Sequence, residues 1–424
     1  MSELSRRKFL RSSAAAGLLL YTPSIVRAQS TTKLSASYST RAFDEIMASE
    51  ASIYKTQSGA TVTYAEPVAA NHDEHLLQIL RWRVTNELPE VSFQANYHIR
   101  QLIREGLAQP LQALADADST WRDVQPRGAI AQVGRMEGKL YGIPFQISVP
   151  VVMINEALAT KAGADISNFP SDWASLINLA KKITTASNGA VGGFFDFGAA
   201  WTFQALITAQ GGKMSNSGET AVGFDGADGL AALEIIRGFG EAGMVDMTQS
   251  QALQAFGAGT IGVLATSNNV LAGLEKQAGG RFKIATVPWP MPSPQGKLPA
   301  GGRTGVVFTS VASQKQAAWA FLRFLASPAA QAIVVKATGA VPVDPTAMKA
   351  SGLLDAFYAE HPNYLAGLAR ADQLTEWYNY PGKNTVKITN VMIDHLKSVA
   401  TLNTTPEQAL KSMTLNVNAL MKSV

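Results

Sequence analysis

The feature that most limits the fold of this chain is its alternation of short β-branched runs with helical stretches. Residues 33–38 (KLSASY) are typical of a strand, a helix is expected from about Arg41, and residues 60–64 (ATVTY) are typical of the next strand. Strands that alternate with helices indicate an α/β fold. The 424 residues are 46% hydrophobic, which is enough for more than one core. We therefore expect an α/β protein of two domains.

Two later segments have clear helical periodicity. Ser171 is the expected N-cap of a helix in which Trp173 and Leu176 face the core. A second helix is expected over residues 315–325, with Trp319 on its buried face. Both helices are expected to be scaffold, because their patterns are those of packed amphipathic helices.

The first 28 residues are expected to be a twin-arginine signal peptide. Residues 5–11 (SRRKFLR) hold an arginine pair followed by Phe-Leu, and residues 26–28 (VRA) offer a cleavage site. The apolar stretch between them is shorter than the roughly 20 residues that span a bilayer. The alternative is an uncleaved amphipathic N-terminus. We expect the mature protein to begin near Gln29 and to be soluble in the periplasm.

Charge and cysteine content argue against several classes of function. Residues 1–28 hold five basic residues and one acidic residue, a net charge of +4, and the whole chain is also +4. The remainder is therefore near neutral and has no Lys/Arg cluster typical of nucleic-acid binding. The chain has no cysteine, which excludes disulfides, thiolate nucleophiles, iron–sulfur ligation and a lipid-modified N-terminal cysteine.

Several motifs occur in an order that resembles one known family. They are residues 138–145 (GKLYGIPF), 151–158 (VVMINEAL), 257–264 (GAGTIGVL), 317–322 (AAWAFL) and 338–343 (TGAVPV). The series resembles the family 1 extracellular solute-binding proteins of ABC importers. This resemblance implies a monomeric receptor without a cofactor, in which two α/β lobes joined by a hinge bind a sugar, polyol or sugar phosphate. Its partners would be the ligand and the membrane subunits of the importer.

The resemblance also implies that each lobe is built from separate stretches of chain. Lobe one would comprise residues 29–145 and 306–343, and lobe two would comprise residues 146–305 and 344–424. A ligand that contacts both lobes binds the closed form better and shifts the population toward it. An importer could then detect closure as occupancy.

Polar and aromatic residues at strand ends and in loops are the candidate ligand contacts. Sugar binding uses flat aromatic faces and hydrogen-bonding groups in a mostly preformed cleft. The candidates are Tyr38, Ser39, Asn71, His72, Asn96, Ser148, Trp201, Ser267, Asn268, Gly302, Arg303, Trp377 and Tyr378. Helix capping, loop polarity and packing between lobes are the alternative explanations.

Two of these candidates have sharper roles. Arg303 follows Gly301 and Gly302, so it could grip a carboxylate, a phosphate or vicinal hydroxyls, or else be a surface arginine beside a hinge turn. Trp201 is expected to stack on the ligand, with packing in the core as the alternative. The sugar-phosphate binders of the family carry a second tryptophan just before the position of Trp201 and a tyrosine where this chain has Ala340, so their ligand is not carried over.

An exported enzyme, either a glycoside hydrolase or a cofactor-dependent one, is the alternative function. His72 and His75 lack a third metal ligand at recognisable spacing. Residues 238–243 (GFGEAG) match a dinucleotide fingerprint, but they end a helical pattern instead of following a strand. Asp196 and Asp225 could be the two carboxylates of a hydrolase, although nothing in the sequence singles them out. We therefore expect no catalytic residue and no metal site.

Overall fold

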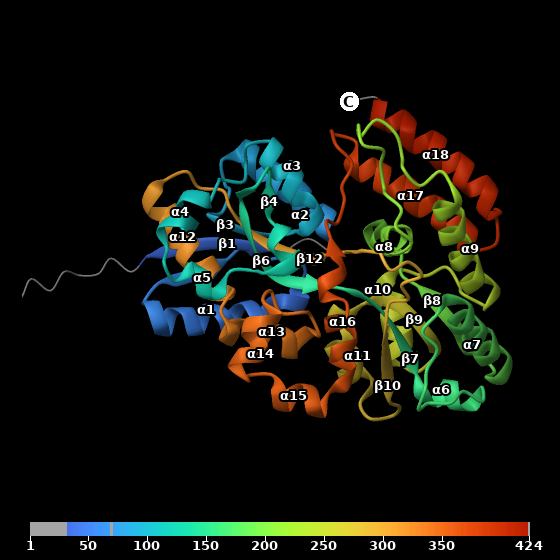
Figure 1. The fold of residues 1–424 in the computed structure, drawn as a ribbon. Coiled ribbons are helices and arrows are strands. Elements are labelled where there is room, and N and C mark those ends of the chain that lie inside the picture. Colours follow the sequence, from blue (N-terminus) through green and yellow to red (C-terminus); the bar gives the residue numbers. More distant parts are fainter. Residues whose placement is uncertain (1–31, 68–70, 423–424) are drawn as a thin grey trace, which may run out of the picture.

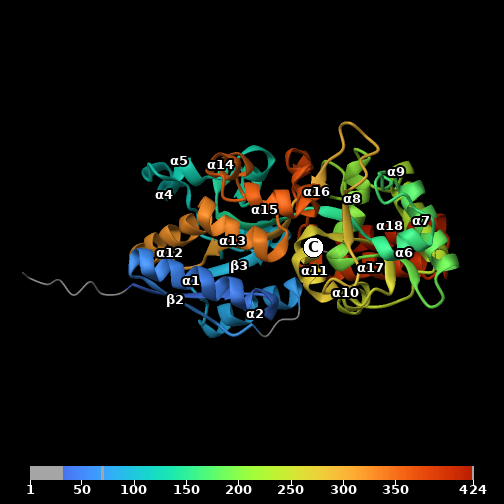
Figure 2. The same cartoon turned by 90° about the horizontal axis from the view of Figure 1, so that it is seen from below.

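Two separate β-sheets organise the chain into two α/β lobes that lie side by side (Figures 1 and 2). The computed structural model describes residues 32–67 and 71–422. The expected signal peptide and the start of the mature protein lie outside these residues. We call the part built on the five-stranded sheet lobe one and the part built on the four-stranded sheet lobe two.

Lobe one has a sheet with the strand order β2-β1-β3-β12-β6. Strand β1 pairs in parallel with β2 and β3, and β12 runs antiparallel to both β3 and β6. The strands are β1 (Lys33–Tyr38), β2 (Thr61–Tyr64), β3 (Val91–Ala95), β6 (Gly142–Ser148) and β12 (Gly301–Val307). All residues of β3, β6 and β12 are buried, although β6 lies at the edge of the sheet.

Helices cover this sheet and extend beyond it (Figure 1). They are α1 (Asp44–Ser58), α2 (His72–Thr85), α3 (Ile99–Arg104), α4 (Gln112–Ala117), α5 (Trp121–Val124), α12 (Ala312–Leu325), α13 (Pro328–Thr338), α14 (Pro345–Ser351) and α15 (Asp355–Glu360). The hairpin of β4 (Arg135–Met136) and β5 (Lys139–Leu140) precedes β6. Helix α12 starts three residues before the expected helix.

Lobe two has a sheet with the strand order β10-β7-β9-β8, in which only β8 and β9 are parallel. Its strands are β7 (Pro150–Asn155), β8 (Val191–Phe195), β9 (Ile261–Ser267) and β10 (Ile284–Pro288). Its helices are α6 (Glu156–Lys161), α7 (Trp173–Ala186), α8 (Trp201–Ala209), α9 (Ala227–Glu241), α10 (Gln249–Gly257), α11 (Leu271–Ala278), α16 (Leu365–Leu368), α17 (Thr385–Ala400) and α18 (Pro406–Lys422). Between the lobes, β11 (Leu298–Pro299) pairs with β13 (Leu374–Thr375).

Helix α7 shows how the local sequence sets an element. Trp173 and Leu176 are buried, as the periodicity predicts. The predicted cap is wrong: the side chain of Asp172, not Ser171, accepts a hydrogen bond from the backbone N–H of Ser175 at 2.9 Å. A carboxylate at this position also interacts favourably with the helix dipole.

The expected lobe boundaries fall inside secondary-structure elements. The cut after residue 145 divides β6, and the cut after residue 305 divides β12, yet both strands lie whole in the sheet of lobe one. Residues after 343 also begin in lobe one, because Met348 and Leu354 pack with Ala332 and Val335 of α13. The sequence motifs therefore located the crossings between the lobes only to within several residues.

In the described part of the chain no single helix is long and apolar enough to cross a membrane. The bent pair of α12 and α13 passes that test only when the two helices are taken together.

Burial perturbs one carboxyl group of α1. Glu50 is fully buried, and neither of its carboxylate oxygens has a hydrogen-bond partner among the described residues. Burial raises the pKa of Glu50 to about 8. The side chain therefore keeps its proton in the folded protein at neutral pH, whereas the unfolded chain releases it above its ordinary pKa of 4.5.

This difference makes stability depend on pH. The contribution of Glu50 is fully present below pH 4.5 and is lost as the pH rises toward 8, because the unfolded state alone releases the proton in that range. Relative to a Glu50→Gln variant, the free energy of unfolding of the parent should fall by up to about 1.4 kcal/mol per pH unit. Urea unfolding at pH 5, 6, 7 and 8 measures this slope. Glu45→Gln on the exposed face of α1 is the control, and a parallel pH profile of parent and Glu50→Gln would contradict the prediction.

Candidate ligand-binding cleft

A cavity of about 640 Å³ lies between the lobes and takes its walls from both. Lobe one contributes the loop before α1, the start of α2, the corner after β3 and the first residues of β12. Lobe two contributes the segment between β8 and α8, the corner after β9 and one face of α17. The volume is in the range of pockets that enclose small molecules.

Most of the expected ligand contacts line this cavity. They are Asn71, His72, Ser148, Trp201, Ser267, Gly302, Arg303 and Trp377. They come from segments far apart in sequence, which the fold gathers because strand ends of both sheets meet at the cleft.

Three expected contacts are not in the cavity wall and instead support it. Ser39 accepts hydrogen bonds from Nε and Nη2 of Arg303, at 3.2 and 3.0 Å. Asn96 donates to the carbonyl oxygens of Ala300 and Gly301. Asn268 accepts a bond from the N–H of Val149 at 2.9 Å and donates to the carbonyl oxygen of Gly339 at 2.7 Å.

The remaining two expected contacts also lie outside the wall. The hydroxyl of Tyr38 donates to Asp44 at 2.8 Å, and its ring packs edge-on against Tyr64 in lobe one. The ring of Tyr378 lies below the guanidinium of Arg100, 5.9 Å from its centre. Their positions at a strand end and in an aromatic loop predicted proximity to the cleft, but the contacts of these two side chains are with residues outside the cavity wall.

Aromatic rings form one wall of the cavity. The ring of Trp377 lies 4.3 Å from Tyr97, 5.8 Å from Trp201 and 6.3 Å from His72, measured between centroids. Trp201 is only 6% exposed, and its indole N–H donates to the carbonyl oxygen of Pro299 at 3.1 Å. Trp201 therefore both lines the cavity and packs against its neighbours, and its stacking on the ligand stays a prediction.

Arg303 is the cation of the cavity wall. Its side chain is buried, with 4% exposure, and its guanidinium carbon lies 3.9 Å from the centre of the Phe43 ring. Nη1 donates to Gln146 Oε1 at 2.9 Å. Burial lowers the pKa of Arg303 to about 9, so the group remains protonated at neutral pH. The alternative of a surface arginine is wrong.

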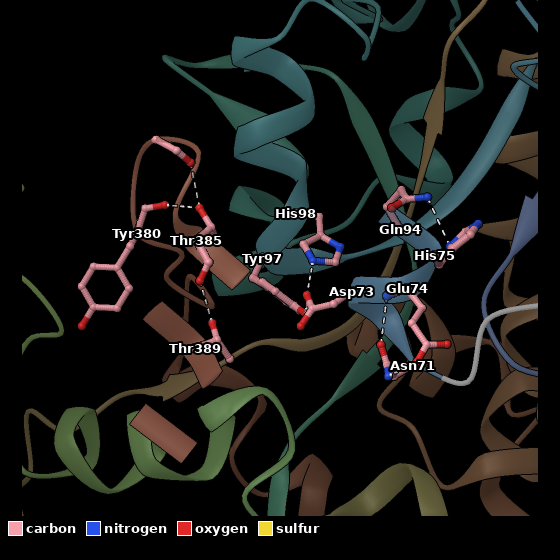
Figure 3. A network of polar contacts seen from close by, with 11 residues as sticks. Asn71, Asp73, Glu74, His75, Gln94, Tyr97, His98, Tyr380, Thr385 and Thr389 are labelled. Carbon is pink, nitrogen blue, oxygen red and sulfur yellow. Dashed lines mark hydrogen bonds and ion pairs between the residues drawn. The ribbon is translucent and has the colours of Figure 1, made fainter. Parts of the chain in front are cut away.

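The start of α2 carries a polar network (Figure 3). Oδ1 of Asp73 accepts hydrogen bonds from the hydroxyl of Tyr97 at 2.6 Å and from Nε2 of His98 at 2.9 Å. Burial alone would raise the pKa of Asp73, but these bonds and the charge of His98 outweigh it and lower the pKa. Burial and nearby positive charge lower the pKa of His75 to about 3 and that of His72 well below its ordinary value. Both histidines are therefore uncharged at neutral pH.

Asp196 provides a carboxylate from lobe two. Its Oδ2 accepts hydrogen bonds from Thr266 at 2.7 Å and Gln249 at 2.5 Å, and its Oδ1 accepts one from the N–H of Gly198 at 2.9 Å. Asp225, the other carboxylate considered for a hydrolase, is exposed and is not part of the cavity wall. Asp225 therefore does not provide a second carboxylate beside Asp196 in the cavity.

The wall residues that are not among the expected contacts include Phe43, Asp73, Tyr97 and Gln249. Asp196, which the sequence suggested only as a hydrolase carboxylate, is another. Asp196 directly follows β8, and Tyr97 directly follows Asn96, so both have the strand-end signal that was applied elsewhere. The pattern did not show which of two adjacent side chains points into the cleft. Within residues 32–67 and 71–422, no group of three or more His, Asp or Glu side chains has the arrangement of a metal site.

Two α/β lobes around an aromatic and polar cleft define a two-lobed binding protein. Solved structures share this fold. The cyclic α-maltosyl-1,6-maltose binding protein from Arthrobacter globiformis has a TM-score of 0.74 at 19% identity, covering 93% of this chain and 100% of that one. UgpB from Mycobacterium tuberculosis, in complex with glycerophosphocholine, has a TM-score of 0.79 at 16% identity, covering 92% and 98%.

The chain belongs to the family of bacterial extracellular solute-binding proteins, whose profile matches residues 80–366. One relative, the sn-glycerol-3-phosphate-binding periplasmic protein UgpB of Agrobacterium fabrum, is 26% identical over 251 residues. That match covers 55% of this chain and 56% of the relative, little more than half of its length. A putative binding protein of Brucella abortus is 23% identical over 333 residues, which is 76% of each chain.

The cleft depends on glycine at position 302. Gly302 has φ of +104°, and a Cβ there would lie 2.0 Å from the carbonyl oxygen of Gln146. We predict that Gly302→Ala lowers the free energy of unfolding by more than about 2 kcal/mol. Gly273→Ala is the matched control, because it lies in α11 with open space around its Cβ and should raise stability by about 0.5–1 kcal/mol. Urea unfolding measures both, and a Gly302→Ala variant as stable as the parent would show that the strand can relax.

Proposed function

We propose that this chain is the periplasmic substrate-binding protein of an ABC importer, and that it captures a sugar, polyol or sugar-phosphate-like molecule by closure of its lobes. The observation that carries this proposal is a cleft whose aromatic wall and hydrogen-bonding groups come from both lobes. Such a ligand offers C–H faces for aromatic rings and hydroxyls for polar groups. The names of the matched relatives, which include glycerol-phosphate binders, support the same class.

The periplasmic location in this proposal rests on the twin-arginine segment of residues 5–28. We also propose lobe boundaries that follow the sheets. Lobe one ends at Ser148 and resumes at Gly301, where β12 begins, and the last crossing lies between α15 and α16. The membrane subunits of the importer are the proposed partner.

Thermal-shift screening of the mature chain tests the proposal. Sugars, polyols and their phosphates are the probes, and a ligand at 100 times its Kd should add about 2.7 kcal/mol to the free energy of unfolding. Mass spectrometry of the released ligand separates the alternatives, because a receptor returns its ligand intact. A chemically changed ligand would favour the exported enzyme instead.

Ion pairs outside the cavity wall join the two lobes, and we call them the rim contact. Arg100 of α3 pairs with Glu219, and Nη2 of Arg104 lies 3.5 Å from Oε2 of the same carboxylate. Glu219 lies in a loop of lobe two that is attached to α18, since Asn418 accepts a hydrogen bond from the N–H of Val222. We propose that this contact stabilises the closed form.

Glu219→Gln should therefore weaken ligand binding by up to about fivefold, because exposed ion pairs contribute roughly 0.2–1 kcal/mol. The effect should shrink at high salt. Glu234→Gln on an exposed part of α9 is the matched control. Calorimetric titration with the ligand found by screening measures the change, and equal affinities of parent and Glu219→Gln at low salt would remove the rim contact from the closure model.

A further inference from the structure

Arg303 is a buried positive charge that has no carboxylate partner among residues 32–67 and 71–422. Its described hydrogen-bond acceptors, Ser39 and Gln146, are both neutral. Residues 68–70 are Val-Ala-Ala and contain no acid. Buried charges in proteins are normally paired, because the removal of an ion from water is strongly unfavourable.

The guanidinium retains donors for a further group. It has five N–H groups, and the described bonds use one on Nε, one on Nη1 and one on Nη2. One N–H on each terminal nitrogen therefore remains. Arg303 lines the cavity, and two parallel N–H groups match the two oxygens of a carboxylate or phosphate.

The surrounding chain fixes the orientation of this side chain. The register of β12 against β6 shifts between Arg303 and Thr304, which indicates a β-bulge at this point. The Phe43 ring covers the guanidinium, while Ser39 and Gln146 hold its nitrogens. None of these neighbours carries a negative charge. They therefore orient the guanidinium group for an anionic group of the ligand.

The carboxylates of the cavity have other partners. Asp73 accepts hydrogen bonds from Tyr97 and His98, and Asp196 accepts three from lobe two. Asn71 caps the start of α2 by accepting a hydrogen bond from the N–H of Glu74, and it also donates one to the Glu74 carboxylate. These acids still have lone pairs, which suit the hydroxyl groups of a ligand.

From these contacts we infer that the ligand carries an oxyanion, a phosphate or a carboxylate, which binds Arg303 through two hydrogen bonds. The hydroxyl-bearing part of the ligand then lies toward the aromatic wall and Asp196. This inference rests on the proposed binding function and names its ligand class.

Matched pairs of probes test the charge requirement on the parent protein. The pairs are glycerol 3-phosphate with glycerol, glucose 6-phosphate with glucose, and glucuronate with glucose. The inference predicts that an anionic member binds at least about tenfold tighter than its neutral partner, as expected for charge-assisted hydrogen bonds. The phosphate and glucuronate arms distinguish the two oxyanions. Calorimetric titration measures the affinities.

Variants then assign the effect to Arg303. Arg303→Gln should lose about 10- to 100-fold in affinity for the anionic probe, and with it most of the preference for the anionic over the neutral member of each pair. Arg303→Lys, which keeps the positive charge but lacks the planar guanidinium group, should retain part of the preference for the anionic probe. Arg237→Gln on α9, which pairs with Glu241 away from the cavity, is the control and should bind like the parent. If Arg303→Gln does not fold, the inference is tested by the affinities of Arg303→Lys and by the preference of the parent for the anionic member of each probe pair.

The outcomes separate the two proposals. Neutral sugars or polyols binding as tightly as their anionic partners would overturn the inference and leave the proposed function intact. An anionic preference that persists in Arg303→Gln would also overturn it. A screen in which no sugar, polyol or phosphate binds would overturn the proposed function itself.

Discussion

The structure depends on the close approach of β12 to β6 and to lobe two at the centre of the molecule. Gly302 allows the backbone of β12 to pass the carbonyl oxygen of Gln146, and Gly301 leaves space for the indole ring of Trp201. A Cβ at position 301 would lie 2.7 Å from that ring. Because glycine alone permits both contacts, β12 completes the sheet of lobe one while its first residues line the cleft.

The two sides of the cleft are held together differently. Near the crossing, Asn268 binds Val149, the single residue between β6 and β7, and also Gly339 at the end of α13. These bonds are buried, and leaving such groups unpaired costs about 1–3 kcal/mol each. At the rim contact, the ion pairs of Arg100 and Arg104 with Glu219 are partly exposed, so breaking them requires little free energy. This difference favours opening at the rim while the crossing segments stay bonded.

Charged groups line the cleft on both lobes. Burial keeps His72 and His75 uncharged, and Arg303 supplies a positive charge to the cavity wall of lobe one. Asp196 presents a negative charge from lobe two, supported by three donors. A polar ligand therefore meets the cation Arg303 on lobe one and the carboxylate Asp196 on lobe two, while Trp377 and its neighbouring rings provide an apolar wall. The carboxylates accept hydrogen bonds inside a binding site, and Asp225 does not join Asp196 there.

Local patterns in the sequence determined the class of fold and much of the cleft. Alternating strands and helices predicted the α/β lobes, and strand ends and glycine pairs identified Trp201, Gly302 and Arg303 as wall residues. These properties depend on neighbours along the chain. The tertiary structure alone decided that Tyr97, not Asn96, lines the cavity, and that β6 and β12 lie whole in lobe one. Those outcomes depend on pairings such as Arg303 opposite Ala95, between residues far apart in sequence, which no local pattern specifies.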